Sequence, residues 1–196
     1  MPRVTVLYEN GRNQKTKEFG PHKLVRRCVA DDLGRDLRLL GDHVLTGRPC
    51  AGNSNVRKLC REQLGLLAGR DGVVVAVYDR DKLGDLEPTA NACTKGFVGA
   101  LTQGCEPPDR LRCVLLERNL ETVLEVLRDV RPDLLAPADW KEAIEDKNPT
   151  QRDRALGAAS VERHLAVRAA LRAKMPSFDY LIVKIAKELR AEGSPA

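Results

Sequence analysis

The chain has 196 residues, of which 42% are hydrophobic and 31% are charged, and its formal net charge at pH 7 is +5. This length suits one ordinary domain with a small helical addition, and the composition is that of a globular protein rather than a disordered one. The N-terminal residues lack the pattern of a secretory signal, and no apolar run approaches a membrane span. We therefore expect a cytoplasmic protein without a membrane partner, and the basic charge is compatible with a partner that carries phosphates.

The cysteines and histidines do not form a recognisable metal site. The six cysteines are Cys28, Cys50, Cys60, Cys93, Cys105 and Cys113, and no two of them form a Cys-x-x-Cys pair. Three histidines, His22, His43 and His164, have no ligand spacing to one another or to the cysteines. We expect reduced, buried thiols, structural histidines and no bound zinc.

The N-terminal quarter begins as a strand followed by a helix. Val4–Tyr8 is β-branched and apolar, and the turn residues Glu9–Gly11 end it. Apolar residues recur at helical spacing over Leu24–Leu33, with Gly34 as a stop.

The second quarter repeats this order. Weak alternation over Leu37–Leu45 suggests a second strand, and apolar residues over Val56–Leu67 predict a helix that either Asn53 or Ser54 caps. The run Gly72–Tyr78 is continuous and β-branched, as in a strand that is buried on both faces of a parallel sheet.

The third quarter continues the alternation. We expect a helix around Phe97–Leu101, a strand over Cys113–Leu116 and a helix bearing Leu120–Leu127. Strands that alternate with helices imply an α/β fold with a mainly parallel sheet flanked by helices.

From about Pro132 the pattern is helical throughout. Pro149 and Pro176 divide it. The expected helices are Pro137–Ile144, Arg152–Leu171 and Phe178–Leu189. We therefore predict an α/β domain over residues 1–131 and a helical, arginine-rich C-terminal extension over 132–196 that packs on it.

Three acidic residues follow predicted strands. Glu9 comes after the first strand, and Asp79 and Asp81 come after the run that ends at Tyr78. In an open parallel sheet the ligand crevice lies beyond the carboxyl ends of the strands, and aspartates two residues apart in an extended segment project to one side. Clustered carboxylates of this kind suit Mg²⁺ bound to phosphate oxygens. Helix caps, turns or a solvated surface are the alternative roles of such acids.

Two of these segments resemble the signature motifs of the TOPRIM domain. "VTVLYENG" ends a first strand with a glutamate, and "VVVAVYDRD" ends a later strand with Asp-x-Asp. TOPRIM domains occur in primases, topoisomerases, RecR-type recombination proteins and OLD-type nucleases. The resemblance covers roughly residues 1 to 130 and implies a Rossmann-like TOPRIM fold. It also implies that Glu9, Asp79 and Asp81 act as catalytic ligands of Mg²⁺ or Mn²⁺.

A third segment extends the resemblance. "CVLLERNLETVLEVL" is similar to a segment of small stand-alone TOPRIM-like proteins of unknown function, some of which are associated with phage defence. There a strand leads to a glutamate and an apolar helix. On this resemblance Glu121 is a further catalytic acid, and Glu117 is the other candidate.

Basic residues near these acids are candidate contacts to nucleic-acid phosphates. Lys15 and Lys17 lie in the loop after the first strand, and Arg80 and Lys82 alternate with the aspartates. A solvated loop and simple charge balance are the alternatives. The C-terminal helices are also rich in arginine and lysine, either as a solvated face or as a binding surface. With three Phe, three Tyr and one Trp in the chain, base stacking is not expected to dominate.

The sequence thus favours a magnesium-dependent TOPRIM-like nuclease, or phosphodiester-transfer protein, that acts on nucleic acid and has a role in phage defence. The first alternative is a catalytically inactive TOPRIM-like subunit that binds a protein partner within a defence system. The second is a phosphatase of the haloacid-dehalogenase type, which ranks last because that family places its Asp-x-Asp on the first strand of the core. The choice of DNA or RNA and the oligomeric state are left open.

Overall fold

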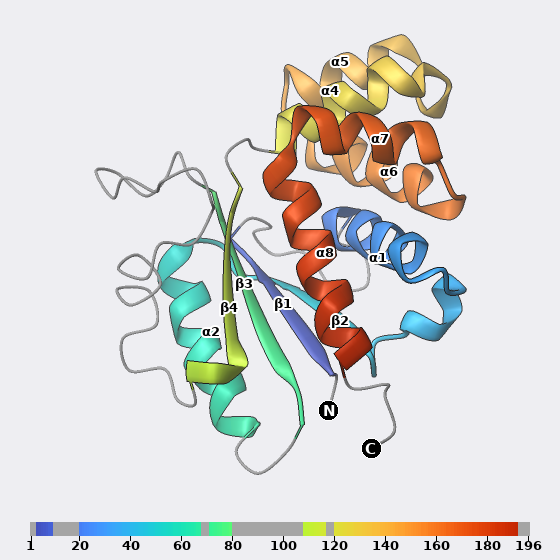
Figure 1. The fold of residues 1–196 in the computed structure, drawn as a ribbon. Helices are drawn as coiled ribbons and strands as arrows, with labels where there is room; N and C mark the ends of the chain where they lie inside the picture. Colours follow the sequence, from blue (N-terminus) through green and yellow to red (C-terminus); the bar gives the residue numbers. More distant parts are fainter. Residues whose placement is uncertain (1–2, 10–19, 68–70, 80–107, 117–119, 192–196) are drawn as a thin grey trace.

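A computed structural model describes residues 3–9, 20–67, 71–79, 108–116 and 120–191 (Figure 1). Within these ranges one sheet is formed by β1 (Val4–Tyr8), β2 (Leu45–Pro49), β3 (Val73–Asp79) and β4 (Leu111–Leu116). The strand order is β2-β1-β3-β4, and every neighbouring pair is parallel. The short 3-10 helix η4 (Pro108–Arg110) leads into β4. The expected α/β class with a parallel sheet flanked by helices is confirmed, and it is consistent with a Rossmann-like fold.

Side chains of the two central strands alternate between two hydrophobic clusters. Every residue of β1 and of β3 is buried. One cluster takes Val4, Val6, Tyr8, Val73, Val75 and Val77. The other takes Leu7, Val74, Ala76 and Tyr78. The unbroken apolar run in β3 therefore reflects a strand that is covered on both faces of the sheet.

Helices cover the two faces unequally. The face that carries Leu7 and Tyr78 packs against α2 (Asn53–Leu66), which contributes Val56, Cys60 and Leu64. The opposite face packs against α1 (Gly20–Leu33) and α8 (Pro176–Ala191), and Figure 1 shows these two helices on the far side of the sheet from α2.

The remaining helices form a layer beside α1. They are α4 (Leu120–Val130), the 3-10 helix η5 (Pro132–Leu134), α5 (Pro137–Ile144), α6 (Pro149–Val161) and α7 (Leu165–Lys174). α4 contacts α5, α6 and α7, while α6 and α8 pack on α1 (Figure 1). One hydrophobic cluster holds residues from both sides of the predicted boundary at 131/132, so that boundary stays a prediction.

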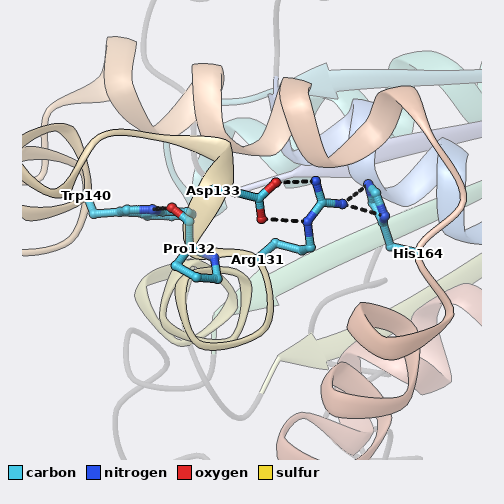
Figure 2. A network of polar contacts seen from close by, with 5 residues as sticks. All are labelled: Arg131, Pro132, Asp133, Trp140 and His164. Atoms are coloured by element: carbon cyan, nitrogen blue, oxygen red, sulfur yellow. Dashed lines mark hydrogen bonds and ion pairs between the residues drawn. The ribbon is translucent and has the colours of Figure 1, made fainter.

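A polar network ties this helical layer together (Figure 2). Arg131, which follows α4, donates from Nε and Nη2 to the two carboxylate oxygens of Asp133, at 2.8 and 2.6 Å. Its Nη1 lies 2.7 Å from Nδ1 of His164, the residue before α7. Nearby, the Trp140 indole N–H donates to the Pro132 carbonyl at 3.0 Å. The guanidinium holds the pKa of Asp133 below its usual value, so this pair stays charged.

The second strand does not lie where the sequence analysis put it. Residues Leu37–Leu40 form the 3-10 helix η2, and β2 begins at Leu45. Asp36 caps η2 by accepting the Arg38 N–H at 2.8 Å. The strand itself contains Gly47 and Pro49, which weaken a strand pattern, and β2 tolerates them because it is an edge strand.

Two helix boundaries also differ from the prediction. Neither Asn53 nor Ser54 caps α2, since the N-cap is Gly52 at φ +118°, a conformation open to glycine. The single helix expected over Arg152–Leu171 is two helices, because the chain turns extended at Glu162 (φ −118°, ψ 163°). The helix expected around Phe97–Leu101 lies outside the described residues.

The described cysteines are Cys28, Cys50, Cys60 and Cys113, and all four are buried thiols. Burial raises the pKa of the Cys28 thiol to about 12 and that of Cys50 to about 11. Cys93 and Cys105 lie outside the described ranges. In the part of the chain that the structure describes, no helix combines the length and apolar character needed to cross a membrane.

Gly47 is predicted to be intolerant of a side chain. A Cβ at this position would overlap Cγ and Nδ1 of the buried His22 ring. Gly47→Ala should therefore lower the free energy of unfolding by about 1–3 kcal/mol, as overpacking does in other cores. Gly65→Ala is the matched control, because nothing lies within 4 Å of its Cβ and it sits in α2. That change should stabilise by about 0.5–1 kcal/mol. Urea unfolding of both variants measures the two changes in unfolding free energy. Equal effects would contradict the close packing of Gly47 against His22.

Candidate functional site

The switch point of the sheet lies between β1 and β3. The chain passes from β1 outward to β2 on one side, and from β3 outward to β4 on the other. In open α/β sheets, ligands bind beyond the carboxyl ends of the strands at such a point. Glu9 directly follows β1, and Asp79 is the last residue of β3. Two predicted site residues therefore stand where this fold class binds its ligands.

Glu9 and Asp79 are in direct contact. The Asp79 main-chain N–H donates to Oε2 of Glu9 at 3.0 Å. The Glu9 N–H in turn donates to the Val77 carbonyl at 3.2 Å, which continues the β1–β3 ladder by one residue. Both side chains are almost fully buried, with 6% of Glu9 and 5% of Asp79 exposed. Burying two acids side by side is costly, and the N–H donated to Glu9 offsets part of that cost.

The connection from β2 to α2 closes one side of this position. The Cys50 N–H donates to the Tyr8 carbonyl at 2.8 Å, and the Gly52 N–H donates to the Glu9 carbonyl at 2.7 Å. Ala51 takes φ +56° between them, so the chain turns sharply into α2. The first turn of α2 therefore begins next to Glu9. The sequence analysis missed this neighbour, although Gly52 before a helical pattern was the available signal.

Tyr8, the residue before Glu9, forms a hydrogen-bonded pair with His22. The hydroxyl of Tyr8 and Nδ1 of His22 are 3.0 Å apart, and their rings meet edge to face. Burial raises the pKa of Tyr8 well above 10, and burial together with Arg26 lowers the pKa of His22 to about 4. Both groups are therefore uncharged near neutral pH. The imidazole tautomer decides which of the two groups donates in this hydrogen bond.

The other predicted site residues are not placed. Asp81, Arg80, Lys82, Lys15, Lys17 and Glu117 lie outside the described residues. Glu121 lies in the first turn of α4, and its side chain is not described. Among the described residues, no three acidic, histidine or cysteine side chains come together as a ligand group.

The donors that are placed fit a hard divalent cation. Mg²⁺ is commonly held by one or two carboxylates and completes its shell with waters and phosphate oxygens. Glu9 and Asp79 supply two carboxyl groups on adjoining strand ends, in a nearly dry environment where like charges repel strongly. Asp81 lies two residues further along the chain and is the predicted third donor.

Comparisons with models of protein families, with curated proteins and with solved structures find no match for this chain. The position of Glu9 and Asp79 in the fold is therefore the observation on which a function is proposed below.

The contact between Glu9 and Asp79 predicts different stabilities for two replacements of Glu9. Glu9→Ala removes the acceptor of a buried N–H and should cost about 1–3 kcal/mol of unfolding free energy. Glu9→Gln keeps an oxygen acceptor of the same reach and removes the charge, so it should cost less than about 1 kcal/mol. Chemical unfolding of the two proteins in metal-free buffer measures the difference. Equal losses would show that this hydrogen bond does not hold the strand end.

His22 predicts a pH dependence of stability. Its pKa is about 4 in the folded chain against 6.5 for an unperturbed histidine, so the unfolded state binds more protons between these values. Stability should therefore fall as the pH drops through this window, by about 3 kcal/mol in total.

His22→Asn keeps a neutral side chain that can donate to or accept from Tyr8 and does not titrate in this range, which makes it the matched control. The variant should show a flatter curve of unfolding free energy between pH 6.5 and 4. Parallel curves for parent and variant would contradict the assignment of a buried neutral imidazole.

Proposed function

We propose that this chain is a magnesium- or manganese-dependent TOPRIM-like enzyme that cleaves or transfers phosphodiester bonds in nucleic acid. The observation that carries the proposal is the contact of Glu9 with Asp79 at the switch point of a parallel sheet. The motifs "VTVLYENG" and "VVVAVYDRD" contain these two residues, so the resemblance and the geometry concern the same two positions.

Each residue has a role in this proposal. Glu9, Asp79 and Asp81 are the metal ligands, and Glu121 is a supporting acid or general base. A metal bound there would supply charge stabilisation for the phosphate and a more acidic water. The chain itself orients the carboxylates. Main-chain hydrogen bonds at Glu9 and the Asp79 N–H fix the two strand ends relative to each other before any substrate binds.

The cellular role follows from the resemblance alone. Small stand-alone TOPRIM-like proteins associated with phage defence are the group that "CVLLERNLETVLEVL" is similar to. We therefore extend the proposal to a cytoplasmic protein of a defence system, with a nucleic-acid substrate and a protein partner.

A second candidate is a subunit with an inactive acidic site. It is favoured by one observation, because Oε2 of Glu9 is already engaged by the Asp79 N–H. A carboxylate that closes the end of a strand in this way has a structural role without any metal. In that case the acids stabilise the fold and a protein partner is the ligand.

Melting temperatures and cleavage assays separate the two candidates. For the enzyme, Mg²⁺ should raise the melting temperature of the parent protein by preferential binding to the folded state. Asp79→Asn and Asp81→Asn should remain folded, melt at or above the parent without metal, and lose the magnesium response, since each removes one of the repelling charges.

The same proteins are then incubated with single- and double-stranded DNA and RNA, with and without Mg²⁺ or Mn²⁺. The enzyme candidate requires metal-dependent cleavage by the parent and at least about a 100-fold loss in Asp79→Asn. If magnesium shifts no melting temperature, no substrate is cut and the aspartate variants melt lower, the inactive subunit is the correct description.

A further inference from the structure

A pocket of about 350 Å³ lies between the end of α1 and the start of α7. The last turn of α1 contributes Asp31 and Asp32 to its lining. Three guanidinium groups also line it, from Arg163, which precedes α7, and from Arg168 and Arg172 of α7. Pockets that enclose small ligands have volumes of about 300–1,000 Å³, so this one is at the small end of that range.

The pocket is separate from the acidic strand ends. β1 and β2 are parallel neighbours and α1 connects them, so α1 starts near the carboxyl end of β1 and runs back toward the amino end of β2. Asp31 and Asp32, in its last turn, therefore lie toward the amino ends of the strands. Glu9 and Asp79 lie at the carboxyl ends. A ligand in this pocket is thus remote from the proposed metal ligands.

Positive charges outnumber negative charges in the ion-pair cluster around this pocket. Among the described residues, six ion pairs of 2.6–4.0 Å join three aspartates to five arginines. The aspartates are Asp31, Asp32 and Asp179, and the arginines are Arg27, Arg163, Arg168, Arg172 and Arg190. The cluster therefore carries a formal excess of two positive charges. An anionic group that enters the pocket balances this excess.

The arginines of the pocket keep hydrogen-bond donors that the fold does not use. Arg163 Nε lies 3.9 Å from Asp31, and Arg172 Nε lies 3.4 Å from Asp179. Neither guanidinium has a hydrogen-bond acceptor among the described residues, and the two side chains are 59% and 63% exposed. Nη1 of Arg168 is buried and also lacks an acceptor there. Because a planar guanidinium donates to two oxygens of one group, these side chains are suited to an oxyanion.

We propose that this pocket binds a small phosphate monoester whose organic part carries hydroxyl or amino groups. A phosphate monoester has a charge of about −1.5 to −2 near pH 7, which matches the excess charge of the cluster better than a single carboxylate does. The arginines donate to the phosphate oxygens, and Asp31 and Asp32 accept from the hydroxyl or amino groups. Leu165, which is 66% exposed, and Ala169 give the pocket an apolar wall. This site needs neither a metal nor the proposed nuclease activity.

The test compares two charge-matched variants of the full chain. The pocket variant carries Arg163→Gln and Arg172→Gln. The control variant carries Arg154→Gln and Lys174→Gln, whose side chains are 64% and 52% exposed and form ion pairs with aspartates outside the pocket. Each variant loses two exposed, ion-paired positive charges from the same helical layer, so a difference between them reports the pocket. Circular dichroism first establishes that both are folded.

Calorimetric titrations in buffer with a chelator use adenosine 5′-monophosphate and ribose 5-phosphate as the esters, and adenosine and inorganic phosphate as comparison compounds. The parent and the control variant should bind at least one ester with a Kd below about 1 mM, and the pocket variant at least about tenfold more weakly. Adenosine and inorganic phosphate should each bind the parent at least about tenfold more weakly than that ester. A parent that binds neither ester, equal affinities of the two variants, or a comparison compound that binds as tightly as the esters would overturn the proposal.

A second pair of variants tests the pocket without any change of charge. Ala169→Phe adds a large side chain to the pocket wall, and Ala166→Phe, at another exposed position of α7 that does not line the pocket, is its control. Both variants should fold, because each replaced side chain is exposed. Ala169→Phe should weaken binding of the ester by at least about tenfold, while Ala166→Phe should bind it like the parent. Parental affinity in Ala169→Phe would place the ligand elsewhere and overturn the proposal.

Discussion

The pairing of β1 with β3 is the constraint on which the rest of the structure depends. These strands are 69 positions apart in the register, with Val4 opposite Val73 and Tyr8 opposite Val77. Because both strands are central, each must bury side chains on two faces, and helices must cover both faces. The same register places the carboxyl ends of β1 and β3 side by side. A change of one residue in the pairing would separate Glu9 from Asp79 and turn the valines that face α1 and α8 toward the face that packs against α2.

Both acids at this edge are almost fully buried, and the Glu9 carboxylate accepts a hydrogen bond from the Asp79 main chain. The nearby Tyr8 and His22 are both neutral near neutral pH, so this pair adds no charge beside the two acids. The main chain does the positioning, through the N–H groups of Glu9, Asp79 and Gly52. Burying the two acids is costly, and the N–H that Asp79 donates to Glu9 offsets only part of that cost.

The predictable parts of the chain were those in which local chemistry and burial agree. Val4–Tyr8 and the run before Asp79 are short β-branched apolar segments, which is the pattern of a buried strand, and both are strands. Gly34 follows α1 at φ +62°, the left-handed conformation in which a glycine ends a helix. β2 could not be found in this way. Its residues Gly47 and Pro49 are poor strand formers, and the strand exists because β1 offers an unpaired edge and His22 needs the space above Gly47. Likewise, neither glycine nor proline marks the break at Glu162, while α6 and α7 on its two sides both pack on α4.

The candidate site also has one part that the sequence predicts and one part that it does not. Alternation along the sequence predicts parallel strands whose carboxyl ends meet at one edge of the sheet, and the observed strand order places Glu9 beside Asp79. The Gly52 N–H on the Glu9 carbonyl does not, because it depends on where β2 ends.

The basic charge of the chain illustrates why position matters more than composition. A net charge of +5 gives no indication of which surface meets a partner. In the helical layer, arginine side chains form ion pairs with aspartates of neighbouring helices. These arginines raise the isoelectric point of the chain, but the paired charges cancel and create little electric field in the solvent.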